Sequence, residues 1–300
     1  MFDNVKKILT YGIGEEGGFY KSHPFLNLIY FVVVIGTTMF SNHPVFLFVS
    51  FITAWLYSVL LNGKKAICFN SIVIFPIILI TVFMNAINVH SGETVLFSVK
   101  AYSITKEAVV FGFIQGIMLS SAIIWFSCFN AVVTEDKMIY MFGRIAPVIA
   151  LTLSMILRFI PLFKKRFREV YDAQRCMGRN GARRGMVDRI RRFGKTISIL
   201  IAWSLEASIE SADSMEAKGY GLRGRTSFHL FRLKRKELVH LALMVVLGAV
   251  CIVACAMNYT NIYYYPTIQI QPVSVMQGIA MVSFCLLMYT AVIMDIRGRK

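Results

Sequence analysis

Charged residues are scarce in this sequence, and acidic ones are the scarcest. Only 16% of its 300 residues are charged, and 16 Asp and Glu stand against 32 Lys and Arg. Hydrophobic residues make up 57%, and the mean hydropathy is +0.63. A soluble fold of this length cannot bury so many apolar side chains, whereas lipid can cover them. The composition therefore excludes ordinary soluble domains and predicts an integral membrane protein.

Several chemical motifs are also missing. The six cysteines form no C-x-x-C pair, and Cys251 and Cys255 have no His or acid beside them, so they should pack as small hydrophobes. The five histidines lack the H-E-x-x-H spacing of zinc enzymes. Lys195 stands in a Gly-Lys-Thr run, but Arg189 occupies the place of the first glycine of a phosphate-binding loop. We therefore expect no metal, cofactor or nucleotide site in this chain.

Six apolar runs have about the 20 residues that a helix needs to cross a bilayer. Residues 1–22 mix charges without an apolar core, so no signal peptide is expected. The runs contain almost no ionisable groups, with His240 the main exception, which argues against a proton-coupled carrier. They cover residues 25–40, 45–61, 71–87, 108–133, 238–257 and 273–294.

Lys and Arg in the connecting segments predict the orientation. Lys64 and Lys65 follow the second run, whereas the link between the first two runs carries no formal charge. The N-terminus, the end of the fourth run and the basic C-terminus are therefore expected in the cytoplasm. Residues 95–106 alternate in part between apolar and polar, which predicts a short hairpin on the outer side.

Two further apolar stretches, residues 145–163 and 196–212, are not expected to cross the bilayer fully. If both crossed it, residues 164–195 would lie outside, although they hold 12 basic side chains against three acidic ones. We therefore expect two helices that lie along the membrane or only partly in it, with cytoplasmic tips. Residues 158–236 carry a net charge of +13 out of +16, whose sign fits attraction to anionic lipid.

Helical periodicity supports this interpretation of both stretches. The first continues into a mostly apolar stripe made of Phe159, Phe163, Phe167, Val170, Gln174 and Met177. The second places acids on one face and apolar residues toward the other, namely Glu206, Glu210 and Asp213 against Ile197, Ile201, Leu205 and Met215. Each helix runs into a glycine, Gly178 or Gly219, the usual residue just past a helix end.

Two segments resemble the signature regions of the energy-coupling factor (ECF) transporter T component, the EcfT/CbiQ family. They are LRFIPLFKKRFREVYDAQRCMG at residues 157–178 and SADSMEAKGYGLRGRTSF at residues 211–228. In that family each of two cytoplasmic coupling helices ends in an Ala-Arg-Gly motif. His23-Pro24 before the first run and the order of the runs fit as well, so the resemblance covers most of the chain.

The resemblance implies an all-α integral membrane protein with about six transmembrane helices and two long amphipathic cytoplasmic coupling helices. Residues 1–133 would form a four-span region, residues 134–236 the coupling-helix region and residues 237–300 a two-span region. It further implies a non-catalytic subunit that binds two ABC-type ATPases, which bind the ATP. Their movement would pass to a membrane-embedded substrate-binding S component that imports a vitamin or a metal. Nucleic acid is not expected as a partner.

The chain departs from the family motif at both predicted ATPase-coupling sites. The second site is Ala217-Lys218-Gly219, in which Lys keeps the charge but lacks the planar fork of Arg. The first is Cys176-Met177-Gly178, which has no central charge. Either Arg175 and Arg179 replace that charge from the flanks, or Met177 packs into an apolar groove.

An alternative function stays open from the sequence. A stand-alone membrane enzyme or permease could use the basic segment to bind anionic lipid or a phosphorylated substrate. Arg158, within the first of the two stretches, either snorkels to lipid headgroups or contacts the S component. Co-purification of two ATPases would favour the coupling subunit, whereas activity of the isolated chain would favour the alternative.

Overall fold

The computed structural model describes residues 18–88, 94–99, 102–177, 186–220, 235–260, 262, 264 and 275–297. The chain divides into two compact units. The bundle unit combines Met1–Met138 with Phe231–Lys300, and the α7–α8 unit is Ile139–Leu230. The second unit is therefore an insertion between two parts of the first.

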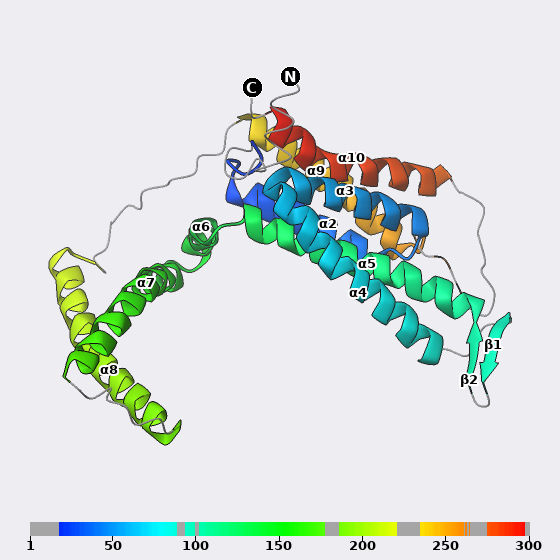
Figure 1. Ribbon diagram of the computed structural model, residues 1–300. Helices are drawn as coiled ribbons and strands as arrows, with labels where there is room; N and C mark the ends of the chain where they lie inside the picture. Colours follow the sequence, from blue (N-terminus) through cyan, green and yellow to red (C-terminus); the bar gives the residue numbers. More distant parts are fainter. Residues whose placement is uncertain are drawn as a thin grey trace. The chain divides into compact units, whose positions relative to one another are not determined.

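Helices make up most of the bundle unit (Figure 1). Two of them begin alike: Pro24 and Pro44 each stand in the first turn, where the missing N–H costs no helical hydrogen bond. Nδ1 of His23 accepts a hydrogen bond from the amide of Phe25 at 3.4 Å, and His43 caps the next helix in the same way. The helices are α2 (Pro24–Phe40), α3 (Pro44–Asn62), α4 (Lys64–Asn88), α5 (Lys106–Val132), α9 (Arg235–Ala256) and α10 (Val275–Arg297).

The α7–α8 unit is built from two long helices that cross each other (Figure 1). They are α7 (Pro147–Cys176) and α8 (Met186–Ala217), and α6 (Glu135–Ile145) leads into them from the bundle unit. The predicted pair of long amphipathic helices is thereby confirmed. Of the residues of this unit whose burial is described, only five are buried: Met141, Ala150, Gln174, Thr196 and Leu200.

Six helices in the described part of the chain are long and apolar enough to cross a membrane. They are α3, α4, α5, α7, α9 and α10, and α2 is a shorter apolar helix of 17 residues. The predicted multi-pass, all-α membrane fold is therefore confirmed. One detail differs from the sequence analysis: α7 qualifies by length and composition, although its apolar stretch was not expected to span the bilayer fully.

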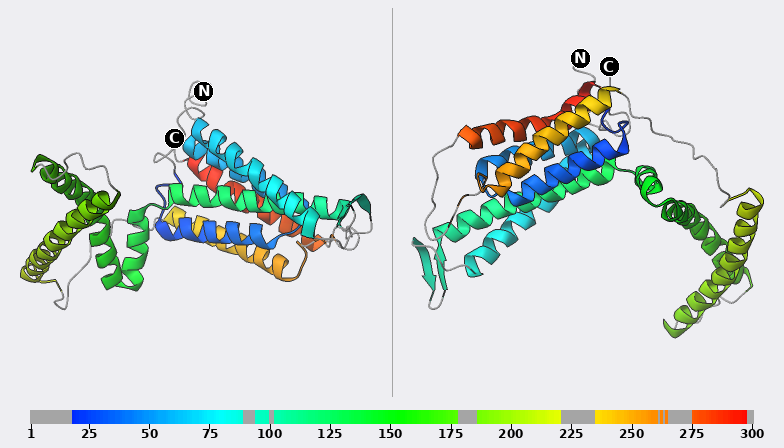
Figure 2. Two further views of the ribbon diagram at one scale, coloured as in Figure 1. Left: turned by 60° about the horizontal axis from the view of Figure 1, so that its bottom comes forward. Right: turned by 180° about the vertical axis from the view of Figure 1, so that it is seen from behind.

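Helices α4 and α5 pack closely because α5 carries two glycines one turn apart. A Cβ at Gly112 would lie 2.9 Å from the Cα of Val82, and one at Gly116 would lie 2.6 Å from Oγ1 of Thr81. This small-xxx-small spacing lets two backbones approach each other, and such packing favours helix association in lipid. Both views in Figure 2 show α4 and α5 side by side.

The core of the bundle unit is aromatic, and several of its polar side chains form hydrogen bonds between helices. Its largest fully buried side chains include Trp125, Tyr30, Tyr57 and Phe31. The ring of Phe19, from the turn before α2, meets Tyr30 edge-on at a centroid distance of 5.1 Å. Nε1 of Trp125 donates to Oγ of Ser50 at 3.1 Å, and the Tyr30 hydroxyl donates to the carbonyl of Met288 at 3.0 Å. These bonds satisfy groups that would otherwise be unpaired in an apolar interior.

The bundle unit has two distinct ends. At one end lie the turn at residues 18–22, the α3–α4 turn and the ends of α5 and α10, which were predicted to share one side of the membrane (Figure 1). At the other end is the antiparallel pair β1 (Val95–Val99) and β2 (Tyr102–Thr105), so the predicted hairpin is confirmed.

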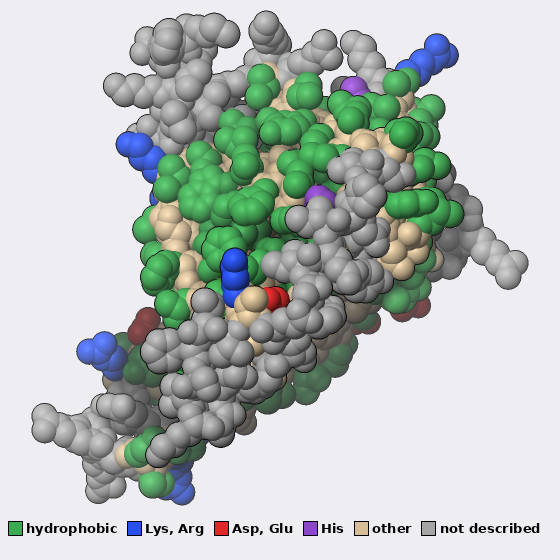
Figure 3. Space-filling model, turned by 90° about the vertical axis from the view of Figure 1, so that its right-hand side faces the viewer, with side chains coloured by type: hydrophobic (Ala, Val, Ile, Leu, Met, Phe, Trp, Pro, Cys, Tyr) green, Lys and Arg blue, Asp and Glu red, His purple; other side chains and the backbone are tan. Residues whose placement is uncertain are grey.

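Apolar side chains cover the outside of the bundle unit. In the view of Figure 3, hydrophobic side chains form most of the described surface and charged ones are few. Exposed examples are Phe75, Leu79 and Phe83 on α4 and Val246 and Val253 on α9. Contiguous apolar surface of this kind is unfavourable in water and is satisfied by hydrocarbon.

Candidate coupling site

The second predicted motif lies at the C-terminal end of α8, where the backbone forms a Schellman motif. The amide of Gly219 donates to the carbonyl of Glu216 at 2.8 Å, and the amide of Tyr220 donates to that of Met215 at 3.0 Å. Gly219 has a φ of 73°, a left-handed conformation that a Cβ makes unfavourable. Glycine therefore ends the helix here and leaves Lys218 as its C-cap residue.

Lys218 and Ala217 are both exposed at this helix end. The last carbonyls of a helix carry partial negative charge, which stabilises a cation there. Arg166 and Glu169 (2.9 Å) form the one ion pair found among the described residues, so Lys218 has no acidic partner within that part of the chain. Its ammonium can therefore donate charge-assisted hydrogen bonds to acidic groups of another protein.

The first predicted motif begins at the end of α7. The helix ends at Cys176, and Met177 is its C-cap residue. Arg175 and Cys176 are exposed, and 62% of Met177 is exposed. Gly178 and Arg179 lie outside the described residues. As far as it is described, this motif presents one cationic and one apolar side chain, Arg175 and Met177.

Most of the predicted stripe on α7 lies toward α8. Gln174 is buried, and its Oε1 accepts a hydrogen bond from Oγ1 of Thr196 on α8 at 3.3 Å. Met177, the last member of the stripe, is 62% exposed, although its amide still donates to the carbonyl of Ala173 at 3.1 Å. The remaining members are half-buried: Phe159, Phe163, Phe167 and Val170.

On α8 the packed face differs from the apolar face expected from periodicity. Trp203 meets Phe163 of α7 edge-on at 5.8 Å, and Leu200 is buried. The apolar residues that were grouped opposite the acids lie mostly outside this contact: Ile197, Ile201 and Leu205 are exposed, and Met215 is half-buried. The unit therefore keeps an apolar surface that α7 does not cover.

The two motifs are held well apart. Gln174, near the end of α7, contacts Thr196, which precedes Lys218 by 22 residues along the uninterrupted α8. At 1.5 Å per residue this corresponds to about 33 Å along the helix. One shallow groove cannot hold both helix ends, so the geometry suits two separate binding sites.

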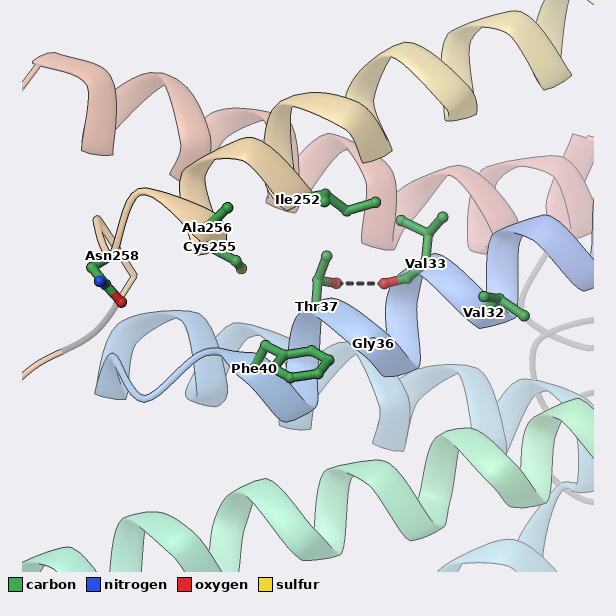
Figure 4. A pocket seen from close by; sticks show the side chains of 9 residues that line it. All are labelled: Val32, Val33, Gly36, Thr37, Phe40, Ile252, Cys255, Ala256 and Asn258. Carbon is green, nitrogen blue, oxygen red and sulfur yellow. Dashed lines mark hydrogen bonds between the residues drawn. The ribbon is translucent and has the colours of Figure 1, made fainter.

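A groove of about 510 Å³ lies between α2 and α9 in the bundle unit (Figure 4). Val32, Gly36 and Phe40 line it from α2, and Ile252 and Ala256 line it from α9. The Thr37 hydroxyl in its wall already donates to the carbonyl of Val33 at 2.7 Å. No Asp, Glu, Lys, Arg or His occurs among the described lining residues, so the groove suits hydrocarbon rather than a polar solute.

The described part of the chain also contains no group of three His, Cys, Asp or Glu side chains placed to hold a metal ion. The Cys176 side chain at the first motif is exposed and Cys251 is buried in the bundle unit. The features that stand out chemically are thus the exposed ends of α7 and α8.

Comparison with known proteins agrees with this picture. The family model for CbiQ, described as a cobalt transport protein, matches residues 21–230. The chain belongs to this family. As a T component of the EcfT/CbiQ type, it shares its fold with transporter transmembrane proteins.

Curated relatives of this T component include proteins named EcfT. An energy-coupling factor transporter transmembrane protein EcfT of Lactobacillus helveticus is 25% identical over 242 residues, which cover 76% of this chain and 86% of the relative. EcfT 1 of Listeria monocytogenes is 28% identical over 188 residues, which cover 58% and 69%. A putative ABC transporter ATP-binding protein of Bifidobacterium longum is 25% identical over 188 residues, which cover 58% of this chain and 24% of that protein.

The bundle unit of the T component also buries charged residues that the sequence pattern did not single out, among them Lys137 and Asp295. Lys137 is 3% exposed and Asp295 is fully buried. The signal was present, because Asp295 directly follows the sixth apolar run and Lys137 comes four residues after the fourth. A charged residue at such a position usually faces headgroups or water, so the pattern alone does not separate a buried residue from a solvated one.

Proposed function

We propose that this chain is the transmembrane coupling subunit of an ECF-type ABC uptake transporter. It transmits the ATP-driven motion of two ATPases to a membrane-embedded S component that imports a vitamin or a metal. The chain itself performs no catalysis and binds no cofactor, because the ATPases bind the ATP. The observation that carries this proposal is the pair of exposed helix ends, about 33 Å apart along α8, on a unit distinct from the bundle.

Charge supports the ATPases as the partners of these ends. Lys218 is the C-cap residue of a helix that ends in a Schellman motif, and Arg175 is exposed near the end of the other helix. Cations in such positions bind acidic grooves through charge-assisted hydrogen bonds that also set the orientation of the partner. The alignment with a protein named as an ABC transporter ATP-binding protein favours the same class of partner.

The uncovered apolar surface of α8 supports a second, membrane-embedded partner. Ile201, Leu205 and Ile209 follow one another at intervals of four residues and are 54%, 62% and 64% exposed. An exposed apolar stripe of this kind is typical of a surface that another protein or lipid covers. In this proposal the S component covers part of it, and the S component, rather than this chain, selects the substrate.

The positive charge of the α7–α8 unit supports a cytoplasmic location of this unit. We propose the same side of the membrane for the N- and C-termini. Arg184 lies within this basic segment, outside the described residues. A cysteine replacing Arg184 should resist an impermeant thiol reagent in intact cells and react after permeabilisation. Ready labelling in intact cells would contradict this orientation.

Co-purification and reconstitution test the function as a whole. The tagged chain should co-purify with two ABC-type ATPases and an S component. Vesicles that contain the complex should accumulate substrate only when ATP is present on the side of the membrane that corresponds to the cytoplasm. The purified chain alone should hydrolyse no ATP. Turnover of a substrate by the isolated chain would favour the stand-alone enzyme or permease instead.

A further inference from the structure

A buried polar cluster lies in the bundle unit where the chain leaves it for the α7–α8 unit. Lys137, the third residue of α6, donates from Nζ to the carbonyls of Tyr20 and of Val132, the latter at 2.8 Å. Its ammonium also lies 4.3 Å from the centre of the Tyr20 ring. Asp295, in the last turn of α10, accepts a hydrogen bond from the amide of Phe19 at 2.7 Å.

Both charged side chains bind the same short turn before α2. The backbone groups they use belong to adjacent residues, Phe19 and Tyr20. Asn27 of α2 completes the cluster when its amide is oriented to satisfy both neighbours. Its nitrogen then donates to the carbonyl of Phe19 at 3.1 Å, and its oxygen accepts from Nζ of Lys137 at 3.0 Å. Four segments, the turn, α2, α6 and α10, are thus joined through hydrogen bonds.

Keeping the buried side chain of Lys137 charged costs desolvation free energy. Burial lowers the pKa of Lys137 to about 8, while the nearby Asp295 carboxylate acts in the opposite direction. The side chain therefore stays mostly charged at neutral pH. A buried charge persists where its hydrogen bonds are satisfied, and Lys137 has three oxygen acceptors and an aromatic face around it.

The position of Lys137 distinguishes this cluster from other buried polar groups of the bundle. The boundary between the two units falls after Met138, and α6 continues across it to Ile145 without interruption. A displacement of α6 along or about its axis would therefore strain the hydrogen bonds of Lys137. The neighbouring residues Glu135 and Asp136 are exposed and lie outside the cluster.

We propose that Lys137 and Asp295 are positioning residues that anchor the start of α6 to the bundle unit and so transmit motion of the α7–α8 unit to the membrane helices. This inference rests on the proposed function as a coupling subunit. A firm hydrogen-bonded anchor makes the first turn of α6 move with α2 and α10, whereas a loose one lets α6 shift alone. Loss of the anchor should therefore uncouple ATP hydrolysis from uptake.

The test compares variants in the reconstituted complex with both ATPases and the S component. Lys137→Met removes the donors while keeping an unbranched side chain, and Asp295→Asn removes the charge but can still accept from the Phe19 amide. We expect Lys137→Met to lower uptake per ATP hydrolysed by about tenfold, within the usual range of coupling effects. Asp295→Asn should lower it less. Asp136→Asn, an exposed neighbour on α6, is the matched control and should behave as the parent.

The double variant Lys137→Met with Asp295→Asn tests whether the two residues anchor α6 or only stabilise the fold. Removing both charges leaves no unpaired buried charge, so thermal stability and ATPase co-purification should recover relative to Lys137→Met. Uptake per ATP should stay low because the bonds to Tyr20 and Val132 are still absent. Parental coupling in the double variant, or its failure to assemble, would overturn the anchor. Absence of uptake by the parent complex would instead overturn the proposed function.

Discussion

The two units of this chain differ in how far they bury their apolar side chains. In the bundle unit, Trp125, Tyr30 and Tyr57 are fully enclosed by neighbouring helices. In the α7–α8 unit, the largest contact residues, Phe163 and Trp203, are only half-buried between two crossing helices. The bundle thus holds its own core, whereas the α7–α8 unit has a single contact layer and needs partners or lipid to cover the rest. A self-contained core beside a less enclosed pair of helices fits the proposed role as a coupling subunit.

The largest expected effect concerns an exposed residue of the α7–α8 unit. Lys218→Glu should abolish ATPase binding or uptake while leaving the fold intact, because attraction to an acidic groove becomes repulsion. Truncating one member of a buried interfacial charge pair costs roughly 2–5 kcal/mol, and reversal should cost at least as much. Co-purified ATPase and substrate uptake measure the effect, with Lys218→Arg as the control that should be tolerated. Parental behaviour of Lys218→Glu in both assays would remove Lys218 from the coupling site.

The second prediction tests the bundle unit. Gly116→Leu should force α4 and α5 apart, because even a Cβ at this position would lie 2.6 Å from Oγ1 of Thr81. Overpacking of this kind costs about 1–3 kcal/mol and should lower the thermal unfolding temperature in detergent. Gly36→Ala is the matched control, since a Cβ there meets nothing within 4 Å. Equal unfolding temperatures of the two variants would contradict the close α4–α5 contact.

A smaller effect is expected at the end of α8. Gly219→Ala places a Cβ on a residue with a φ of 73°, which costs about 1–2 kcal/mol. The Schellman motif should open and Lys218 should lose its fixed position, so ATPase affinity should fall by about 5- to 30-fold. Titration of the ATPases against the solubilised chain measures this, and Gly219→Asn, which tolerates the left-handed region better, should lose less. An unchanged affinity would show that the rigid helix end is not needed.

The smallest effect is expected at the first motif. Met177 is 62% exposed and contributes little to the fold, and exposed substitutions usually change stability by less than about 0.5 kcal/mol. Met177→Ala should therefore leave the unfolding temperature unchanged and reduce uptake less than Arg175→Ala does. A large loss of uptake for Met177→Ala, with a mild one for Arg175→Ala, would show that this helix end binds an apolar groove.

Much of the fold could be predicted because hydropathy and the spacing of apolar residues depend only on neighbours in the sequence. The apolar runs, the hairpin near residue 100 and the long amphipathic helices all follow from residues close in sequence. The role of Gly219 was also predictable, since a left-handed residue past a helix end favours glycine whatever lies around it. The last residue of α7, Cys176, could not be predicted, because periodicity does not state where a helix stops.

The sequence by itself determined that this chain is a membrane protein, which of its segments are helical, and at which residues the two motifs lie. These properties depend on composition and short-range geometry. The tertiary structure alone decided which side chains meet. Only it brings Lys137 and Asp295, 158 positions apart, onto the same turn at Phe19 and Tyr20. Only it leaves Ile201 and Leu205 exposed while Leu200 is buried on the same helix. The physical reason is that burial depends on neighbours distant in the chain, and no local pattern contains them.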